Sequence, residues 1–315
     1  MKNMMWAYLL HLGDNMWRDE WDENSISPFY EELSMDEQVW RKIIDFLPSQ
    51  GIDTVLIDLG DGMEYERHPE LAVKGAWSKD KLKKELDYIR SLGMTPLPKL
   101  NFSACHDAWL KEYSRMLSTT PYYQVCKDVI EEVVEVFDNP QYFHLGLDEE
   151  NAELQRCLQH VCIRQKDLWW HDAYYLFNVC ENLGVRPWVW ADACWKNPEE
   201  YVEKMPKSVL QSNWWYNTIK EKNSDGIYPR AEYDTYRVLE EAGFDQIPTS
   251  SSFEGYQFSS DRTMKLGKNV IHPERLKGYM TVPWRNTRTR ELYALFNDAY
   301  QFGIAKKDVY PETCK

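Results

Sequence analysis

The sequence predicts one (β/α)8 barrel, an α/β fold of the TIM-barrel class, spanning residues 1–315. Short apolar, β-branched or aromatic runs alternate with amphipathic helical stretches, which is typical of parallel strands joined by helices. Eight such runs occur, and their starts lie roughly 25 to 50 residues apart, as one strand, one helix and two loops require. Eight units favour a closed barrel over an open sheet, and one barrel commonly fills a chain of this length.

The expected strands follow these apolar runs. In chain order they are WAYLLHL from Trp6, IDTVLIDL from Ile52, MTPLPKL from Met94, YFHLGL from Tyr142, VRPWVWA from Val185, SVLQSN from Ser208, FDQIPTS from Phe244 and LKGYMTV from Leu276. In a barrel of this kind the chemistry gathers in the loops after the carboxyl ends of the strands. Those segments read GDNMW, GDGMEYERH, NFSACHDAW, DEEN, DACW, WWY, SSFEGY and WRNT, so acids, amides and aromatic rings converge at one end.

The expected helices have clear start and stop signals. Ser78 is an N-cap before KDKLKKELDYIRSLG, whose leucines and isoleucine share one face, and Gly93 ends the helix. The same pattern recurs in DEQVWRKIIDFLPSQG, QVCKDVIEEVVEVF, LWWHDAYYLFNVCENLG and EYDTYRVLEEAG. These helices would form the outer layer of the barrel.

Charge and cysteine content exclude several classes of partner. Lys and Arg total 37 against 51 for Asp and Glu, and the net charge of -14 would repel nucleic acid and anionic membranes. The seven cysteines are scattered and contain no Cys-x-x-Cys pair, which indicates reduced thiols rather than a zinc site. The apolar stretch near the start is too short to span a membrane and lacks a cleavage site. We therefore expect a cytoplasmic protein, or an exported one whose signal has been removed.

The segment FHLGLDEEN is the strongest chemical signal. Alternate residues of a strand share a face, so we expect His144, Gly146 and Asp148 to point into the barrel while Glu149 begins the loop. Adjacent carboxylates at a strand mouth repel each other and are partly desolvated, which raises a carboxyl pKa toward the range of a general acid. The alternative is that these acids only open a solvated loop.

His-Leu-Gly-Leu-Asp-Glu resembles the His-x-Gly-x-Asp-Glu motif of family 20 glycoside hydrolases, the β-N-acetylhexosaminidases. The resemblance implies that Glu149 protonates the leaving oxygen. It also implies that Asp148 holds the 2-acetamido group of the substrate, which attacks the anomeric carbon in place of an enzyme nucleophile. Such substrate assistance is a recognised exception to the two-carboxylate rule for glycosidases. The implied substrate is a terminal β-linked N-acetylhexosaminide, cleaved by exo action with retention and without cofactor or metal.

The resemblance also implies residues that bind the sugar. PKLNFSACH puts His106 at the third strand, VWADACW puts an aromatic ring and an acid at the fifth, and further tryptophans match the aromatic walls of the family. Sugars present C–H faces to aromatic rings, so these rings have a physical role there. The expected substrate-binding residues are Asp61, Asn101, His106, His144, Trp190, Asp192, Trp214, Trp215, Glu254 and Trp284. Further candidates at the same end are Asp14, Asn15, Glu64, Arg67 and His68.

The sequence departs from the family pattern at the eighth strand. Arg285 and Asn286 follow Trp284, where the family usually has a Glu that binds sugar hydroxyls.

Three alternative functions remain open. A two-carboxylate retaining glycosidase could use Glu149 as acid and Glu254 as nucleophile, although Asp148 stands where that clan has Asn. A metal-dependent hydrolase could use His11, His106, His144 and Asp192, but the first strand lacks a His-x-His pair. A carbohydrate-binding barrel without activity would keep the tryptophans and would not need clustered acids.

Overall fold

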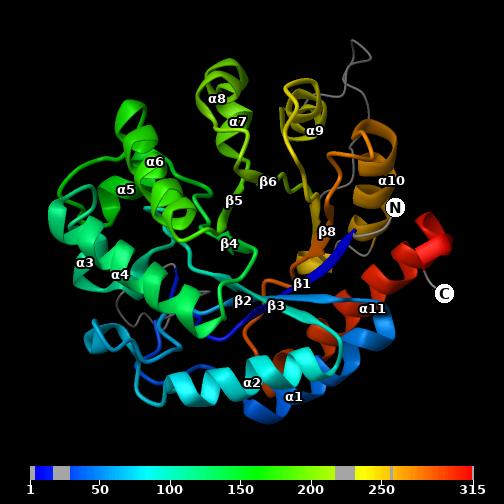
Figure 1. The fold of residues 1–315 in the computed structure, drawn as a ribbon, viewed down its shortest axis with the longest axis horizontal. Helices are drawn as coiled ribbons and strands as arrows, with labels where there is room; N and C mark the ends of the chain where they lie inside the picture. The colour runs from blue at the N-terminus through cyan, green and yellow to red at the C-terminus, as the bar shows by residue number, and fades with distance from the viewer. Residues whose placement is uncertain (1–3, 17–28, 217–230, 256–257, 314–315) are drawn as a thin grey trace.

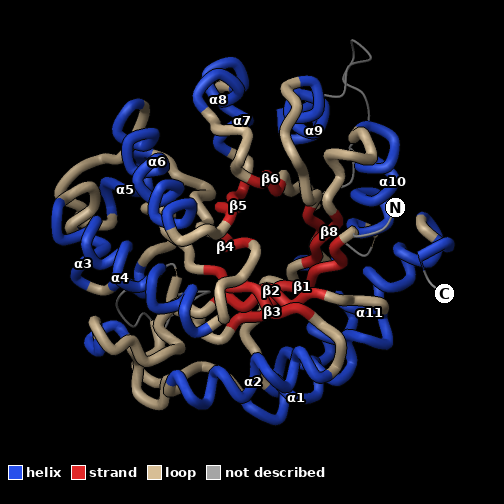
Figure 2. Tube along the Cα trace, in the orientation of Figure 1, coloured by secondary structure: helices blue, strands red, loops and turns tan. Residues whose placement is uncertain are grey.

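The eight strands lie side by side in one parallel sheet. A computed structural model describes residues 4–16, 29–216, 231–255 and 258–313. Within these residues the strand order is β6-β5-β4-β3-β2-β1-β8-β7. The two ends of the sheet meet through the bridges Gln211–Gln246 and Trp214–Thr249, so the sheet closes into a ring, drawn in red in Figure 2. The prediction of a (β/α)8 barrel is confirmed.

All eight expected strands are present. Their bounds are β1 Met5–His11, β2 Thr54–Asp58, β3 Thr95–Lys99, β4 Tyr142–His144, β5 Arg186–Trp190, β6 Leu210–Ser212, β7 Thr249–Ser250 and β8 Gly278–Thr281. The seven strands from β2 to β8 are shorter than their apolar runs. An apolar run in the sequence does not show at which residue the backbone stops hydrogen-bonding to the neighbouring strand.

The helices form the outer layer around this ring (Figure 1). The α-helices are α1 Glu37–Phe46, α2 Lys79–Ser91, α3 Glu112–Arg115, α4 Thr120–Val136, α5 Ala152–Cys157, α6 Asp167–Asn182, α7 Ala193–Lys196, α8 Pro198–Lys204, α9 Ala231–Glu241, α10 Ser259–Val270 and α11 Leu292–Val309. Short 3-10 turns include η3 Ala108–Leu110, η4 Phe253–Gly255 and η5 Thr289–Glu291. The Ser78 side chain accepts a hydrogen bond from the Lys81 amide and caps α2, as predicted.

The core has two parts on opposite faces of the sheet. Outward-facing strand residues pack against the apolar faces of the helices in one continuous cluster. Inward-facing residues fill the lower barrel with the second cluster, which includes Leu9, Leu56, Leu97, Trp188 and Met280. The barrel is therefore a packed core and not a channel.

Near the carboxyl ends of the strands the barrel interior becomes polar. Lys99 and Asp58 form a fully buried ion pair, and His11 Nδ1 lies 3.5 Å from Asp58 Oδ2. Burial by itself would raise the pKa of Asp58, but Lys99 and His11 together lower this pKa to about 2. Asp58 thus stays ionised, and a buried charge is tolerated because its partner is buried with it. This polar layer lies directly below the loops that carry the candidate site.

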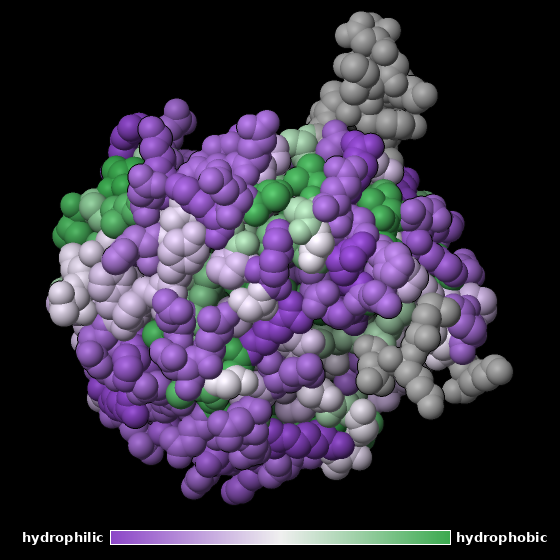
Figure 3. Space-filling view, turned by 45° about the horizontal axis from the view of Figure 1, so that its top comes forward, coloured by the Kyte–Doolittle hydropathy of each residue, from purple (hydrophilic) through white to green (hydrophobic). Residues whose placement is uncertain are grey.

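The surface is mostly hydrophilic on the face drawn in Figure 3. None of the described helices has both the length and the apolar content needed to cross a membrane.

The described cysteines are all free thiols, in line with the expected reduced state. Four of them are buried: Cys105, Cys126, Cys180 and Cys194.

Candidate active site

A pocket of about 400 Å³ opens at the carboxyl ends of the strands. This is the end of the barrel at which the sequence predicted a site. The pocket is lined by His11, Asp14, Met16, Tyr30, Asn101, His106, Asp148, Glu149, Trp214, Tyr216, Phe253, Trp284, Arg285, Asn286, Arg290 and Glu291. Loops after six strands contribute, so the closed ring is what brings distant parts of the chain together.

The segment after β4 turns sharply where the sequence predicted continued alternation. β4 ends at His144, and Gly146, Leu147 and Glu149 have positive φ angles of 72°, 69° and 55°. A side chain at Gly146 would meet Asn101 Oδ1 at 1.9 Å, so only glycine fits there. The expected strand alternation through Asp148 is wrong, because β4 ends at His144 and the backbone then takes left-handed φ angles. Strained backbone of this kind is concentrated at functional sites.

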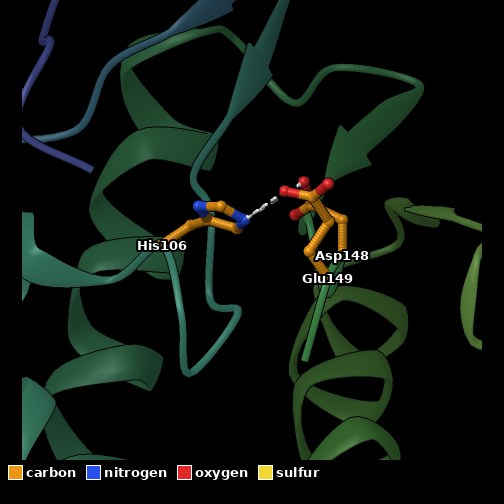
Figure 4. Close-up of side chains that lie close together, drawn as sticks. All are labelled: His106, Asp148 and Glu149. Atoms are coloured by element: carbon orange, nitrogen blue, oxygen red, sulfur yellow. Dashed lines mark hydrogen bonds and ion pairs between the residues drawn. The ribbon is translucent and has the colours of Figure 1, made fainter. Parts of the chain in front are cut away.

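The turn brings Asp148 and Glu149 into the pocket beside His106. His106 comes from the loop after β3, and its ring points toward both carboxylates (Figure 4). His106 Nε2 lies 3.1 Å from Glu149 Oε2 and 3.8 Å from Asp148 Oδ2. Asp148 is buried, and Asn101 Nδ2 donates a hydrogen bond of 2.9 Å to its Oδ1. These contacts give Asp148 a fixed orientation, whereas the Glu149 side chain remains 53% exposed.

The pKa of Glu149 is shifted in the opposite direction from the one that the sequence predicted. The hydrogen bond from His106 lowers the pKa of Glu149, so the expected rise is wrong for the ligand-free protein. Burial lowers the pKa of His106, but Asp148 and Glu149 outweigh that effect and raise it overall. Glu149 therefore rests as a carboxylate paired with a histidine that favours its charged form.

The raised pKa belongs instead to Asp192, which follows β5. Asp192 Oδ2 accepts a 2.8 Å hydrogen bond from the Glu149 amide, and Trp214 Nε1 lies 3.4 Å from its Oδ1. Burial raises the pKa of Asp192 to about 7, and the nearby Asp148 carboxylate adds to the rise. The acid cluster can therefore hold a proton near neutral pH, but on Asp192 and not on the residue that the sequence suggested.

A buried ion-pair network holds the loop that carries these acids. Glu150 pairs with Arg164, and its Oε1 also accepts a 3.1 Å hydrogen bond from the Ala104 amide in the loop after β3. Arg164 is fully buried, donates to the Phe102 carbonyl at 2.6 Å, and pairs with Asp172 of α6. The network links the loops after β3 and β4, which supply His106, Asp148 and Glu149.

Aromatic rings form the wall across from these acids. Trp284 Nε1 donates a 3.0 Å hydrogen bond to Tyr216 Oη, and Tyr216 stacks on Trp214 with ring centroids 5.3 Å apart. Trp284 has a φ of 48°, another left-handed position at the pocket. Fixed aromatic faces beside polar groups suit a ligand that has both apolar C–H faces and hydroxyls.

Several predicted residues lie outside the pocket lining. His144 and Trp190 are buried beneath it with ring centroids 4.5 Å apart. Trp215 packs against the outer core, and Asp61 is buried and accepts a 2.6 Å hydrogen bond from Asn15. These four support the site from below or behind. The backbone of Glu254 lies in η4, but its side chain is outside the described parts of the chain.

Two further candidates are structural. Arg67 Nη1 lies 2.6 Å from Glu131 and 3.0 Å from Asp128, and His68 also pairs with Asp128. Both therefore attach the loop after β2 to α4. They do not line the pocket.

Sequence reasoning did not place several pocket residues in the expected binding set. Tyr216 follows the predicted Trp pair, Phe253 precedes Glu254, and Arg290 and Glu291 lie in η5. The arginines after Trp284 were a usable signal, because they follow the last strand at the end of the barrel where loops carry binding residues. The sequence analysis noted the absence of the family's Glu after Trp284 and did not include the arginines that stand there in the binding set.

One group of described residues has the geometry to hold a metal ion. The ligand atoms of His106, Asp148 and Glu149 lie within 4.8 Å of one another. This set differs from the hypothesised ligands His11, His106, His144 and Asp192, of which His144 lies below the pocket. The same three groups also suit proton transfer. Activity that persists in the chelator EDTA would distinguish proton transfer from metal binding.

Three buried aspartates make stability depend on pH. Burial raises the pKa of Asp61 to about 7, of Asp107 to about 8 and of Asp192 to about 7. In the unfolded chain an aspartate loses its proton near pH 4, about where free aspartate titrates. Between these values the folded protein binds more protons, so its stability falls as pH rises. The melting temperature should therefore drop between about pH 5 and about pH 8.5.

Asp107→Asn keeps the shape of the side chain but does not titrate. The fall in melting temperature with pH should be smaller in this variant than in the wild type, as differential scanning fluorimetry would show. The matched control is Asp308→Asn, an exposed position on α11, which should follow the wild-type profile. A wild-type melting temperature that stays level over this range would contradict the prediction.

Comparison with solved structures identifies the fold. The chain superposes on a family 20 exo-β-N-acetylglucosaminidase from Vibrio harveyi with a TM-score of 0.63 and 13% identity, covering 99% of this chain and 58% of that one. Dispersin B gives 0.63 and 13%, covering 97% of this chain and 99% of that one. This is the fold of the family 20 glycoside hydrolase barrel. A catalytic module of the pneumococcal exo-β-D-N-acetylglucosaminidase gives 0.61 and 15%, covering 98% and 85%.

The resemblance seen in the motif is thus confirmed at the level of the fold. No protein-family model matches the chain, and no curated protein matches it in sequence. The chain spans 58% of the length of the Vibrio harveyi enzyme. The fold places Asp148 and Glu149 at the carboxyl end of β4, and the chemistry has to be argued from the site.

Proposed function

We propose that the protein is a glycoside hydrolase that cleaves terminal β-linked N-acetylhexosaminides with assistance from the substrate's acetamido group. The observation that carries the proposal is the pair Asp148 and Glu149. Their carboxylate oxygens lie within 4.8 Å of each other in a pocket with a tryptophan wall. The solved enzymes that share the barrel support the same conclusion, since the Vibrio harveyi structure is a complex with N-acetylglucosamine.

In this mechanism Asp148 orients the acetamido group. Its carboxylate, held by Asn101, would accept the amide N–H and so push electron density to the acetamide oxygen. The acetamide oxygen forms a bond to the anomeric carbon while the glycosidic bond breaks. The electron pair of the glycosidic bond goes to the leaving oxygen, and Glu149 gives its proton to the leaving oxygen. A water molecule then attacks the anomeric carbon, returns a proton to Glu149 and restores the acetamide, with retained configuration.

Substrate binding would reverse the lowered pKa of Glu149 and so prepare it to act as an acid. Its side chain is 53% exposed in the free protein, and a sugar in the pocket would remove water from it. Desolvation and the nearby Asp148 both favour the protonated acid. His106, whose Nε2 lies 3.1 Å from Glu149, can pass its proton to the Glu149 carboxylate before Glu149 protonates the leaving oxygen.

A panel of chromogenic aryl glycosides tests the proposal. The aryl N-acetyl-β-glucosaminide should be cleaved, the matching β-glucoside should not, and EDTA should change neither rate. Only the first sugar has the acetamido group that supplies the attacking oxygen. Equal cleavage of the glucoside would instead favour Glu254 as nucleophile, loss of activity in EDTA would favour a metal at His106, and no cleavage would leave a binding protein.

A further inference from the structure

We propose that the pocket binds a sugar carrying an anionic substituent, held by Arg285 and Arg290 at the end opposite Glu149. The inference deepens the proposed function, on which it rests for the direction in which the sugar lies. In the ring, three strands separate β4 from β8 on either side. The loop after β8, with its two arginines, therefore lies diametrically opposite the loop that carries Asp148 and Glu149.

The wall after β8 is rich in positive charge within a protein of net charge -14. Arg285, Arg288 and Arg290 fall within six residues, and Arg285 and Arg290 line the pocket. Arg288 lies over the ring of Tyr30, another lining residue, with its Cζ 4.7 Å from the ring centroid. A basic wall in an acidic protein needs an explanation that general surface composition does not give.

The acids on this side occupy only part of the arginines' donor capacity. Glu291 pairs with Arg285 at 3.6 Å and with Arg290 at 3.2 Å, in each case through Nε. A guanidinium has five N–H donors, so this contact engages one donor of each arginine. Asp14 is the other acid on this side of the described pocket lining, and its Oδ2 accepts a 3.2 Å hydrogen bond from Asn286. The remaining N–H donors of Arg285 and Arg290 are thus available to a ligand.

Geometry connects this wall to one end of a sugar. If Glu149 reaches the oxygen at C1, the groups at C4 and C6 of the pyranose point to the opposite wall, because C4 lies across the ring from C1. A sulfate, phosphate or carboxylate there would meet two guanidinium groups. Arginine binds such planar or tetrahedral anions through paired N–H donors. The arginine side chains are 38% and 60% exposed, so they lie at the rim where an anion can reach them.

Binding of free monosaccharides tests the inference without requiring catalysis. Isothermal titration at low salt would compare N-acetylglucosamine with its 6-sulfate, its 6-phosphate and glucuronic acid. We expect at least one anionic sugar to bind about tenfold more tightly than the neutral sugar, with the advantage shrinking as salt is added. The three anions distinguish sulfate, phosphate and carboxylate as the natural group.

Variants locate the effect. Arg290→Gln alone, and together with Arg285→Gln, should remove the preference, and an unchanged melting temperature would show that the variants are folded. Arg237→Gln, an exposed change on α9 with the same loss of charge, should keep the preference. A wild type without preference, or a double variant that retains it, would overturn the inference. If the protein hydrolyses the neutral aryl substrate but binds anionic and neutral sugars equally, this inference alone is wrong. If it binds an anionic sugar more tightly but hydrolyses nothing, only the proposed function is wrong.

Discussion

Glu149→Gln should slow hydrolysis of an unactivated N-acetylhexosaminide by about 10² to 10⁴-fold, the range typical for loss of a general acid. Glutamine has nearly the same shape but carries no transferable proton at this position. The poor leaving group of a natural glycoside depends on that proton. An aryl leaving group depends on it less, because a phenolate leaves readily without protonation.

The ratio between the two substrates is therefore the informative quantity. Steady-state kcat should fall far more for the disaccharide than for the nitrophenyl glycoside. Glu153→Gln, an exposed acid at the start of α5, removes the same charge a few residues away and should leave both rates unchanged. Full activity of Glu149→Gln on the disaccharide would refute the assignment of the acid.

Asp148→Asn should lower kcat on N-acetylhexosaminides by about 10² to 10³-fold, as when a group that stabilises developing charge is removed. The amide side chain fits the same space, but it has no negative charge to polarise the acetamide. Asn101 would then face a neutral side chain in place of its carboxylate partner. Because the attacking oxygen belongs to the substrate, the loss should appear in kcat more than in KM.

Controls separate this loss from misfolding. The melting temperature should change little, and Asp308→Asn should behave as wild type. If the Glu254 route operated, Asp148→Asn would affect N-acetylglucosaminides and glucosides alike. A variant that kept wild-type kcat on the N-acetyl substrate would exclude substrate assistance through Asp148.

The barrel could be predicted from the sequence because its signals are local. Each buried strand is an apolar run, as in β1, where six of seven residues are buried, and helices such as α1 and α2 have a capping side chain at their first turn. The position of the site follows from the same pattern, since chemistry collects at the carboxyl ends of the strands. Asp148, Glu149, Asn101 and His106 were all placed at that end by sequence alone.

The details of the site depend on contacts between distant segments. Asn101, which is 45 residues earlier in the sequence, leaves no room for a side chain at Gly146 in the turn, and strand periodicity cannot show such a contact. The pKa values of Glu149 and Asp192 depend on which groups the fold puts beside them. Arg290 and Glu291 reach the pocket only because the chain bends back in η5.

The network around Glu150 and Arg164 restricts how this protein can change its sequence. Loops at the carboxyl end of a barrel are usually the most freely varied part of the fold, since they carry specificity without supporting the core. Here Glu150 of the loop after β4 pairs with Arg164, a fully buried arginine in the segment that leads into α6. Replacing Arg164 would leave both Glu150 and Asp172 without their cation, whereas replacing Glu150 would leave Arg164 with Asp172 as its carboxylate partner. Libraries that change one codon at a time should therefore recover fewer folded variants at position 164 than at position 150.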